Sequence, residues 1–209
     1  PITSTVGFAL AHDLDAAGAV ARLYMNVWAE VHGVPGRGAT SREPALAGRA
    51  FAEHTFTRPF APPGQRRVTS LAGIDGYPAL PPALHASVAP ATAAAAPAGA
   101  TWLDELAPDP VDVRFTLDQT DANQHVNSLV YVRCVLDAFQ RRLAAGGHPA
   151  TLRSKAFDIA YRKPSFVGDR VRAHLRMFAH GEHVGGAGFL AAAGEEARPR
   201  CFVRVLFGP

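Results

Sequence analysis

The second half of the chain alternates apolar and polar positions in a way that predicts one helix and several strands. Apolar side chains recur at helical spacing between residues 126 and 145, and "AAGGHP" ends that helix. "VDVRFTL" before it alternates like a strand. Four more strand-like runs follow it, namely "TLRSKAFDIAYRK", "DRVRAHLRMFAH", "HVGGAGFLAAAG" and "RPRCFVRVLF". The predicted order is a strand, a long helix and four strands.

The first half is predicted to repeat this order. "FALAHDLDAAGAVARLYMNVWAEVHG", residues 8 to 33, runs from a strand through an Asp cluster into an apolar pattern interpreted as a helix that Gly33 ends. Further on, "TRPFAPPGQRRV" mirrors "YRKPSFVGDRV" at 161 to 171. An Asp cluster, a helix, a strand, a Pro and a Gly therefore occur twice in the same order, which indicates an internal duplication.

A change of composition separates the two halves. "APATAAAAPAGAT", residues 89 to 101, is rich in Ala and Pro and carries no charge, which is typical of a linker. We therefore expect domains at 1–88 and 103–209, joined by a linker at 89–102.

A long helix followed by antiparallel strands buries its apolar stripe most simply when the sheet wraps around it. "TDANQHVNSLVYV" resembles the segment of hotdog thioesterases in which an Asp, then Gly or Gln, then His-Val-Asn introduces the central helix. "YRKPSFVGDRV" resembles their following strand and turn. The chain is similar to tandem hotdog acyl-ACP thioesterases of the plant type and to the broader 4-hydroxybenzoyl-CoA thioesterase-like superfamily. The resemblance implies an α+β double hotdog, each half a central helix wrapped by an antiparallel sheet, with a degenerate first half.

The resemblance also implies site residues. Asp121 and His125 would hold and activate the attacking water and Asn123 would orient it, at a helix N-terminus whose free N–H groups polarise a carbonyl oxygen. Which of Asp121 and His125 is the base stays open. The substrate-binding candidates are Asn127, which we expect to brace the loop, Ser165, Asp15 and Trp28. Neither a metal nor a cofactor is implied.

Simpler interpretations stand beside these. Asp121 or Asn123 would also serve as an ordinary helix N-cap, and His125 as an ordinary histidine. The plant-type enzymes place an acidic residue and a Cys where this chain has Pro164 and Ser165. Either Asp121 therefore suffices, or Asp158 or Ser165 substitutes, or the activity is altered.

The expected function is hydrolysis of an acyl thioester carried by an acyl carrier protein or coenzyme A, in fatty-acid, polyketide or other secondary metabolism. One alternative is a protein that binds acyl thioesters or carrier proteins without catalysis. Another is a tandem-hotdog dehydratase, although the HxxxGxxxxP spacing of those enzymes is missing here. Free thiol released from a thioester would separate the first from the second, and an enoyl product would indicate the third.

Composition narrows the partners and the compartment. The chain has 209 residues, is 48% hydrophobic and carries a net charge of +3, without a basic run interleaved with aromatic residues, so we expect no nucleic acid. No apolar run approaches the ~18 residues of a membrane span. The two cysteines lack metal-ligand spacing, which favours a reducing cytoplasm. We expect a monomer or a homodimer.

Overall fold

The computed structural model describes the chain except residues 1, 35, 37–42, 59–60 and 150. Its contacts divide the chain into two compact units, Pro1–Ser87 and Val88–Pro209. Each unit has its own sheet, and the two are described separately.

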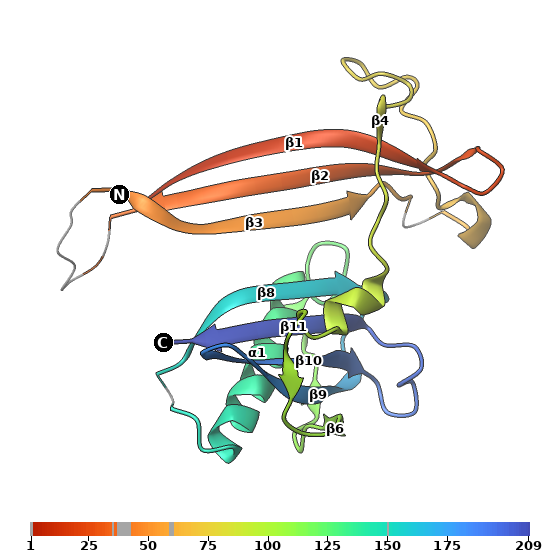
Figure 1. Cartoon of the computed structure of the whole chain (residues 1–209). Coiled ribbons are helices and arrows are strands. Elements are labelled where there is room, and N and C mark those ends of the chain that lie inside the picture. Colours follow the sequence, from red (N-terminus) through yellow and green to blue (C-terminus); the bar gives the residue numbers. More distant parts are fainter. Residues whose placement is uncertain (1, 35, 37–42, 59–60, 150) are drawn as a thin grey trace. The chain divides into compact units, whose positions relative to one another are not determined.

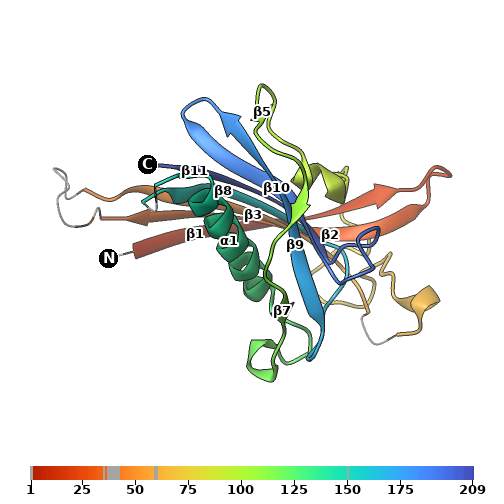
Figure 2. The same ribbon diagram turned by 90° about the horizontal axis from the view of Figure 1, so that it is seen from below.

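The second unit is built from one helix and one antiparallel sheet (Figure 1). The sheet contains β5 (Thr101–Trp102), β9 (Arg170–His180), β10 (His183–Ala191), β11 (Cys201–Gly208) and β8 (Arg153–Tyr161), in that spatial order. Two short strands, β6 (Ala107–Pro108) and β7 (Val113–Arg114), also pair with β9. Helix α1 (Ser128–Ala145) lies across the sheet (Figure 2). The helix and the four strands predicted for this half are confirmed, and the unit has the hotdog-like arrangement of a helix against an antiparallel sheet.

Alternating positions of the sheet form the core against α1. The buried side of α1 includes Val135 and Phe139, which join one hydrophobic cluster with every second residue of β9 and β11. The Phe139 ring occupies the space where a side chain at Gly186 of β10 would begin. Both cysteines are free and buried, and burial raises the pKa of the Cys201 thiol to about 12.

The Ala/Pro-rich segment predicted as a linker packs against the second sheet. Its short helix η2 (Pro90–Ala94) contacts β8, β10 and β11. Arg204 donates a hydrogen bond from Nη1 to the carbonyl oxygen of Ala95 at 2.9 Å. Because Val203 and Val205 on either side of Arg204 face the core, η2 covers the side of the sheet opposite α1.

The first unit is a sheet of long strands. β1 (Ile2–Leu14) and β2 (Val20–Gly33) form an antiparallel hairpin, and β3 (Ala45–Thr55) pairs with the other side of β2. The short strand β4 (Ala83–Leu84) runs parallel to β1 at Ala11 and His12. The spatial order is β3-β2-β1-β4, and a 3-10 turn, η1 (Pro63–Gln65), follows β3 in the chain.

The helix predicted within residues 8–33 is wrong. That stretch is a hairpin, because Gly18 takes a positive φ of 79° and the Asp15 carboxylate accepts the backbone N–H groups of Ala17 and Ala19, both at 2.9 Å. The apolar residues of β2 fit both the helical period and the alternation of a strand. The alternating apolar positions are Leu23, Met25, Val27, Ala29 and Val31. Its β-branched and aromatic residues favour the extended form.

The described part of the first unit contains no α-helix. A double hotdog with a central helix in each half is therefore not confirmed. The turn that was predicted to mirror "YRKPSFVGDRV" includes Pro59 and Phe60, which lie outside the described residues.

Candidate functional site

Residues 120 to 127 form a tight turn immediately before α1. Thr120 and Val126 form an isolated β-bridge across it. The N–H of Asp121 donates to the carbonyl oxygen of His125 at 2.9 Å, and Gln124 has a positive φ of 61°. Few non-glycine residues adopt this conformation, so these bonds hold the loop in an unusual backbone shape.

The Asp121 carboxylate has one engaged oxygen and one free oxygen. Oδ1 accepts the backbone N–H of Asn123 at 2.8 Å and that of His125 at 3.3 Å. Oδ2 has no hydrogen-bond partner among the described residues, and the side chain is exposed. The carboxylate thus stabilises the turn and still presents an oxygen atom to solvent.

Asn127 is the N-cap of α1. Its Oδ1 accepts the backbone N–H of Leu129 at 2.9 Å, and its own N–H donates to the carbonyl of Gln119 at 2.9 Å. The interpretation that Asp121 or Asn123 caps this helix is therefore wrong. Asn127 braces the end of the loop, and its amide oxygen is already used for that purpose.

The other two predicted catalytic side chains extend from the same loop. The Asn123 side chain is exposed and forms no hydrogen bond within the described part of the chain. The half-buried His125 ring meets the Phe166 ring edge to face, with 5.1 Å between centroids and 81° between planes. Asp121, Asn123 and His125 therefore share one ordered turn at the start of the helix.

Ser165 supports the loop from behind. It is fully buried, its carbonyl accepts the N–H of Val126 at 2.9 Å, and its N–H donates to the Tyr131 hydroxyl at 2.7 Å. Its own hydroxyl oxygen has no hydrogen-bond partner among the described residues. In this conformation Ser165 anchors the loop through its backbone, and its side chain is buried.

Two tyrosines lie next to Ser165 and the start of α1. The Tyr131 and Tyr161 rings meet edge to face with centroids 5.6 Å apart. The Tyr161 hydroxyl donates to the carbonyl of Ser128 in the first turn of α1 at 3.0 Å. Burial raises the pKa of Tyr161 to about 12, so this phenol stays protonated and remains a donor at neutral pH. Tyr131, Tyr161 and Phe166 all lie in the two motifs noted in the sequence, but none of them was predicted as a member of the site.

Arg200 was also missed. It is buried beside the turn after β8, where its Nη2 lies 3.5 Å from a carboxylate oxygen of Asp169 and 3.5 Å from one of Glu195. Its Nε has no hydrogen-bond partner in the part of the chain that the structure describes. Asp169 in turn accepts the N–H of Phe166 at 3.1 Å. Since "RPRC" only indicates the start of a strand, nothing in its pattern marked Arg200 as a support of this turn.

Asp158 does not supply the carboxylate that Pro164 replaces. Arg204 binds Asp158 Oδ2 through Nε at 2.9 Å and Nη2 at 2.7 Å. Asp158 lies between Phe157 and Ile159, which pack on the core, so its side chain faces the side of the sheet opposite α1. The expectation that Asp158 substitutes is wrong.

The two candidates in the first unit lie in different settings. Asp15 is exposed and holds the turn between β1 and β2 with its carboxylate. Trp28 is 47% exposed on β2, where its indole lies close against Gly7 of β1. Trp28 therefore packs on the neighbouring strand β1.

The first unit also contains a polar cluster that the sequence did not indicate. His85 lies 2.5 Å from Glu53 Oε2 and 3.1 Å from the Asn26 amide, and Ser87 donates to Glu53 Oε1 at 2.8 Å. Within the described residues, no three His, Cys, Asp or Glu side chains are arranged to hold a metal.

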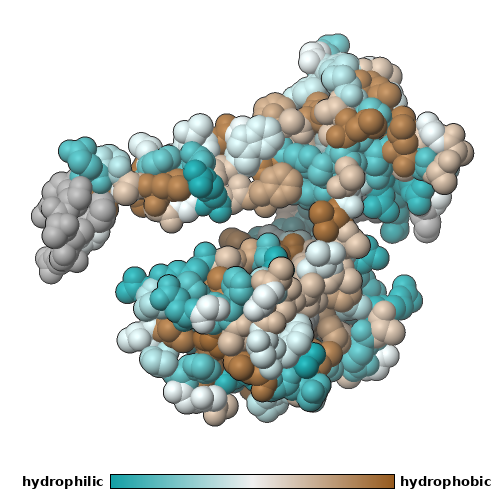
Figure 3. Space-filling view, in the orientation of Figure 1, coloured by the Kyte–Doolittle hydropathy of each residue, from teal (hydrophilic) through white to brown (hydrophobic). Residues whose placement is uncertain are grey.

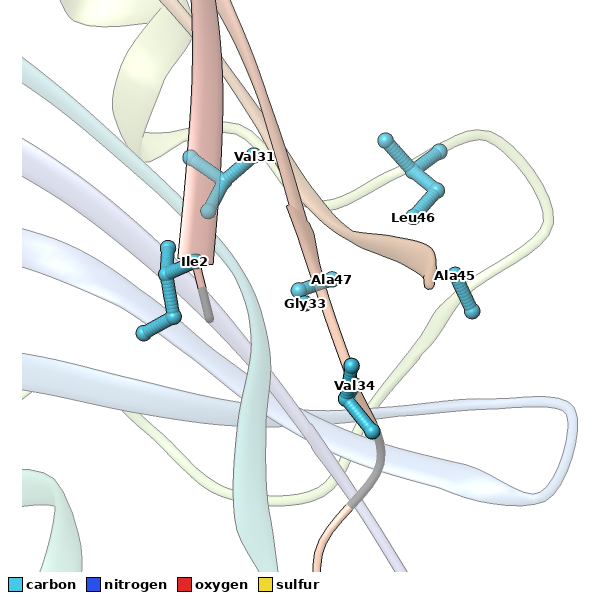
Figure 4. A pocket seen from close by; sticks show the side chains of 7 residues that line it. All are labelled: Ile2, Val31, Gly33, Val34, Ala45, Leu46 and Ala47. Carbon is cyan, nitrogen blue, oxygen red and sulfur yellow. The ribbon is translucent and has the colours of Figure 1, made fainter. Parts of the chain in front are cut away.

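An apolar hollow lies at the other end of the same sheet. It has a volume of about 300 Å³, with Ile2, Val31 and Leu46 among its lining residues (Figure 4). None of its lining residues is polar or titratable, so it offers no chemistry of its own. The described residues also include no helix with the length and apolarity required to cross a bilayer.

No family model and no curated protein matches the chain. Solved structures resemble about half of it. A 1,4-dihydroxy-2-naphthoyl-CoA thioesterase from Synechocystis is 16% identical, with 46% of this chain and 77% of that chain covered and a TM-score of 0.42. A probable thioesterase from Bartonella henselae is 13% identical, with 50% of this chain and 90% of that chain covered and a TM-score of 0.44. A thioesterase from Thermus thermophilus complexed with coenzyme A and Zn is 18% identical, with 46% and 75% covered and a TM-score of 0.41. Similarity at this level does not establish an activity.

Proposed function

We propose that the second unit hydrolyses an acyl thioester at the loop 121–127. The observation that carries the proposal is the Oδ2 atom of Asp121, which has no hydrogen-bond partner among the described residues and shares one ordered turn with the side chains of Asn123 and His125. This turn leads directly into the N-terminus of α1, whose partial positive charge polarises a carbonyl oxygen.

The reaction needs only groups on this loop and a water molecule. Asp121 or His125 accepts a proton as the water oxygen attacks the thioester carbon, and Asn123 orients the water. The negative charge that forms on the carbonyl oxygen is stabilised at the helix N-terminus. The C–S bond then breaks, the carboxylic acid leaves, and the thiolate takes up the proton that Asp121 or His125 had accepted from the water.

The proposed substrate is a thioester of coenzyme A or of an acyl carrier protein. Arg114 and Arg170 lie opposite one another on β7 and β9, both exposed and without an ion-pair partner among the described residues. They adjoin the turn that contacts the loop, since Phe115 and Asp169 are hydrogen-bonded through their backbones at 3.0 Å. Guanidinium groups at this place suit the phosphates of either carrier.

A second candidate function is thioester binding without catalysis. Pro164 stands where the plant-type resemblance implies a carboxylate, and Oδ1 of Asp121 is already hydrogen-bonded within its own turn. Such a protein would bind the acyl thioester at the same loop and release no thiol.

Thiol release from acyl-CoA and acyl carrier protein, measured for the wild type and Asp121→Asn, tests the proposal. An Asn keeps an oxygen that accepts the two N–H bonds of the turn but provides no carboxylate, so we expect turnover to fall ~100-fold while the fold persists. Saturable binding of the thioester without thiol release would favour the second candidate. Unchanged turnover in Asp121→Asn would remove Asp121 from the chemistry.

A further inference from the structure

Strand β3 is a free edge of the first sheet. Among the described residues it pairs with β2 on one side and with no strand on the other. It is 11 residues long and almost entirely exposed, and it contains neither Pro nor Lys. Apolar side chains are visible along the strands of this unit in Figure 3. Natural proteins seldom leave such an edge unprotected, because its unpaired N–H and C=O groups accept another strand.

The hydrogen bonds show which groups of β3 are free. The N–H of Phe56 donates to the carbonyl of Leu23 at 3.0 Å. Alternate residues of an antiparallel strand bond to the same neighbour, and the register continues unshifted from Thr55 back to Gly48. The even-numbered residues 48 to 54 therefore bond to β2. The odd-numbered residues 49 to 55 direct their N–H and C=O groups away from the sheet.

These outward residues are complementary to themselves. If two copies of β3 pair antiparallel with Phe51 opposite Phe51, Arg49 of each copy lies opposite Glu53 of the other. A register in which Arg49 faces Arg49, or Glu53 faces Glu53, sets like charges opposite each other. Opposite charges in facing positions stabilise a strand pair and like charges destabilise it, so the sequence of β3 selects one symmetric register.

The neighbouring side chains suit the same arrangement. Phe51 is 64% exposed and lies beside Trp28, its partner on β2, which is 47% exposed. On the other side of the sheet β3 presents only Ala50 and Ala52 near the centre of the pairing, which leaves the strands free to approach. The free part of the other edge, Ile2 to Leu10 of β1, carries no charge that would select a register.

We propose that β3 binds β3 of a second copy of this chain, antiparallel and centred on Phe51, so that β1–β3 of both copies form one continuous sheet. The pairing is isologous, since each residue contacts its symmetry counterpart, and it therefore closes as a dimer. The interaction is β-strand addition, with backbone hydrogen bonds giving the affinity and the two Arg49–Glu53 pairs giving the register.

Light scattering on the full chain tests the proposal through a charge reversal. We expect the wild type to run at twice the 22.1 kDa of the chain. Arg49→Glu sets four carboxylates around the axis and should raise the dissociation constant at least about tenfold. Arg49→Glu combined with Glu53→Arg should restore the dimer. The matched control is Glu30→Gln, which removes the 2.7 Å ion pair of Arg49 within the chain and should leave the dimer unchanged.

A backbone substitution provides an independent test. Phe51→Pro removes an outward N–H, so it should give a folded monomer, whereas Ala52→Pro removes an N–H that bonds to β2 and should destabilise the sheet. Hydrogen exchange of the wild type needs no variant at all. The amides of Arg49, Phe51 and Glu53 should become protected as concentration rises, while those of Val6 and Phe8 on the other edge should not.

The results that overturn the proposal are equally definite. A wild type that stays monomeric up to about 100 µM would do so. A dimer that withstands both Arg49→Glu and Phe51→Pro would also overturn it. Glu53 also binds His85 and Ser87 within the chain. The dimerisation of the Arg49→Glu, Glu53→Arg variant is therefore compared with that of the wild type only if both have the same melting temperature. Concentration-independent exchange at Arg49 and Phe51 decides against the pairing in any case.

Discussion

At the residue scale, two aspartates perform the same local task in different units. Asp15 and Asp121 each accept two backbone N–H groups with Oδ1, from the residues two and four positions later, and thereby hold a turn of the same length. Short polar side chains are favoured in turns for this reason. The similarity of the two Asp clusters in the sequence therefore reflects turn chemistry, and only the second turn also carries Asn, His and a helix start.

Replacement of the His125 side chain tests its role in thioester hydrolysis. Its ring contacts Phe166 and makes no hydrogen bond within the described residues, so His125→Ala should alter the melting temperature little. If the imidazole activates water, thiol release should fall ~100-fold. Kinetics of thioester cleavage alongside thermal melts measure both effects. A loss of turnover that only follows a loss of folded protein would indicate a structural histidine.

The Asn127 side chain gives the prediction that belongs to stability. Asn127→Ala removes the N-cap of α1 and should lower the free energy of unfolding by about 1 kcal/mol. Asn127→Asp keeps an acceptor and adds a negative charge at the helix N-terminus, so it should be close to neutral. Urea titration of the three proteins checks the order. Equal stability of all three would show that the 2.9 Å bond to Leu129 contributes nothing.

At the element scale, the sequence predicted the second unit well and the first unit poorly. The helix from Ser128 to Ala145 and the strands β8 to β11 were foreseeable because each has one dominant period and a clear Gly or Pro boundary. In β2 the apolar residues fit both a helix and a strand, so the local pattern could not distinguish the two. Pairing with β1 and β3 makes this stretch a strand. The candidate site at 121–127 could be proposed from the sequence because its residues are adjacent in the chain. Tyr131, Phe166 and Arg200 meet it only through tertiary packing.

The contact between α1 and β10 yields a prediction at this scale. The Phe139 ring fills the space in front of Gly186, so Gly186→Val should force the helix from the sheet and destabilise the protein by about 1–3 kcal/mol. Gly64→Ala is the control, because its added carbon would meet no atom within 4 Å. Denaturant unfolding should separate the two variants. A stable Gly186→Val protein would contradict the packing of Phe139 on β10.

At the scale of the whole molecule, the two units share a topological feature that differs from the predicted repeat. β1, β2 and β3 lie side by side in chain order and antiparallel, as do β9, β10 and β11. Each unit therefore contains a hairpin followed by a third strand that pairs with the second strand of the hairpin. The predicted repeat matched the β1–β2 stretch to the helix, although its counterpart by topology is the β9–β10 hairpin.

The boundary between the units leads to the prediction for the whole chain. Because the first compact unit ends at Ser87, a fragment of residues 88–209 should fold alone, with α1 visible by circular dichroism and with any thioesterase activity retained. A fragment of residues 103–209 should be less stable. It lacks η2 over β8, β10 and β11 and the pairing of β5 with β9, which exposes apolar surface and a strand edge. Thermal melts of the two fragments decide between a packed segment and a free linker at 88–102. Equal melting temperatures would mean that this segment adds nothing to the second unit.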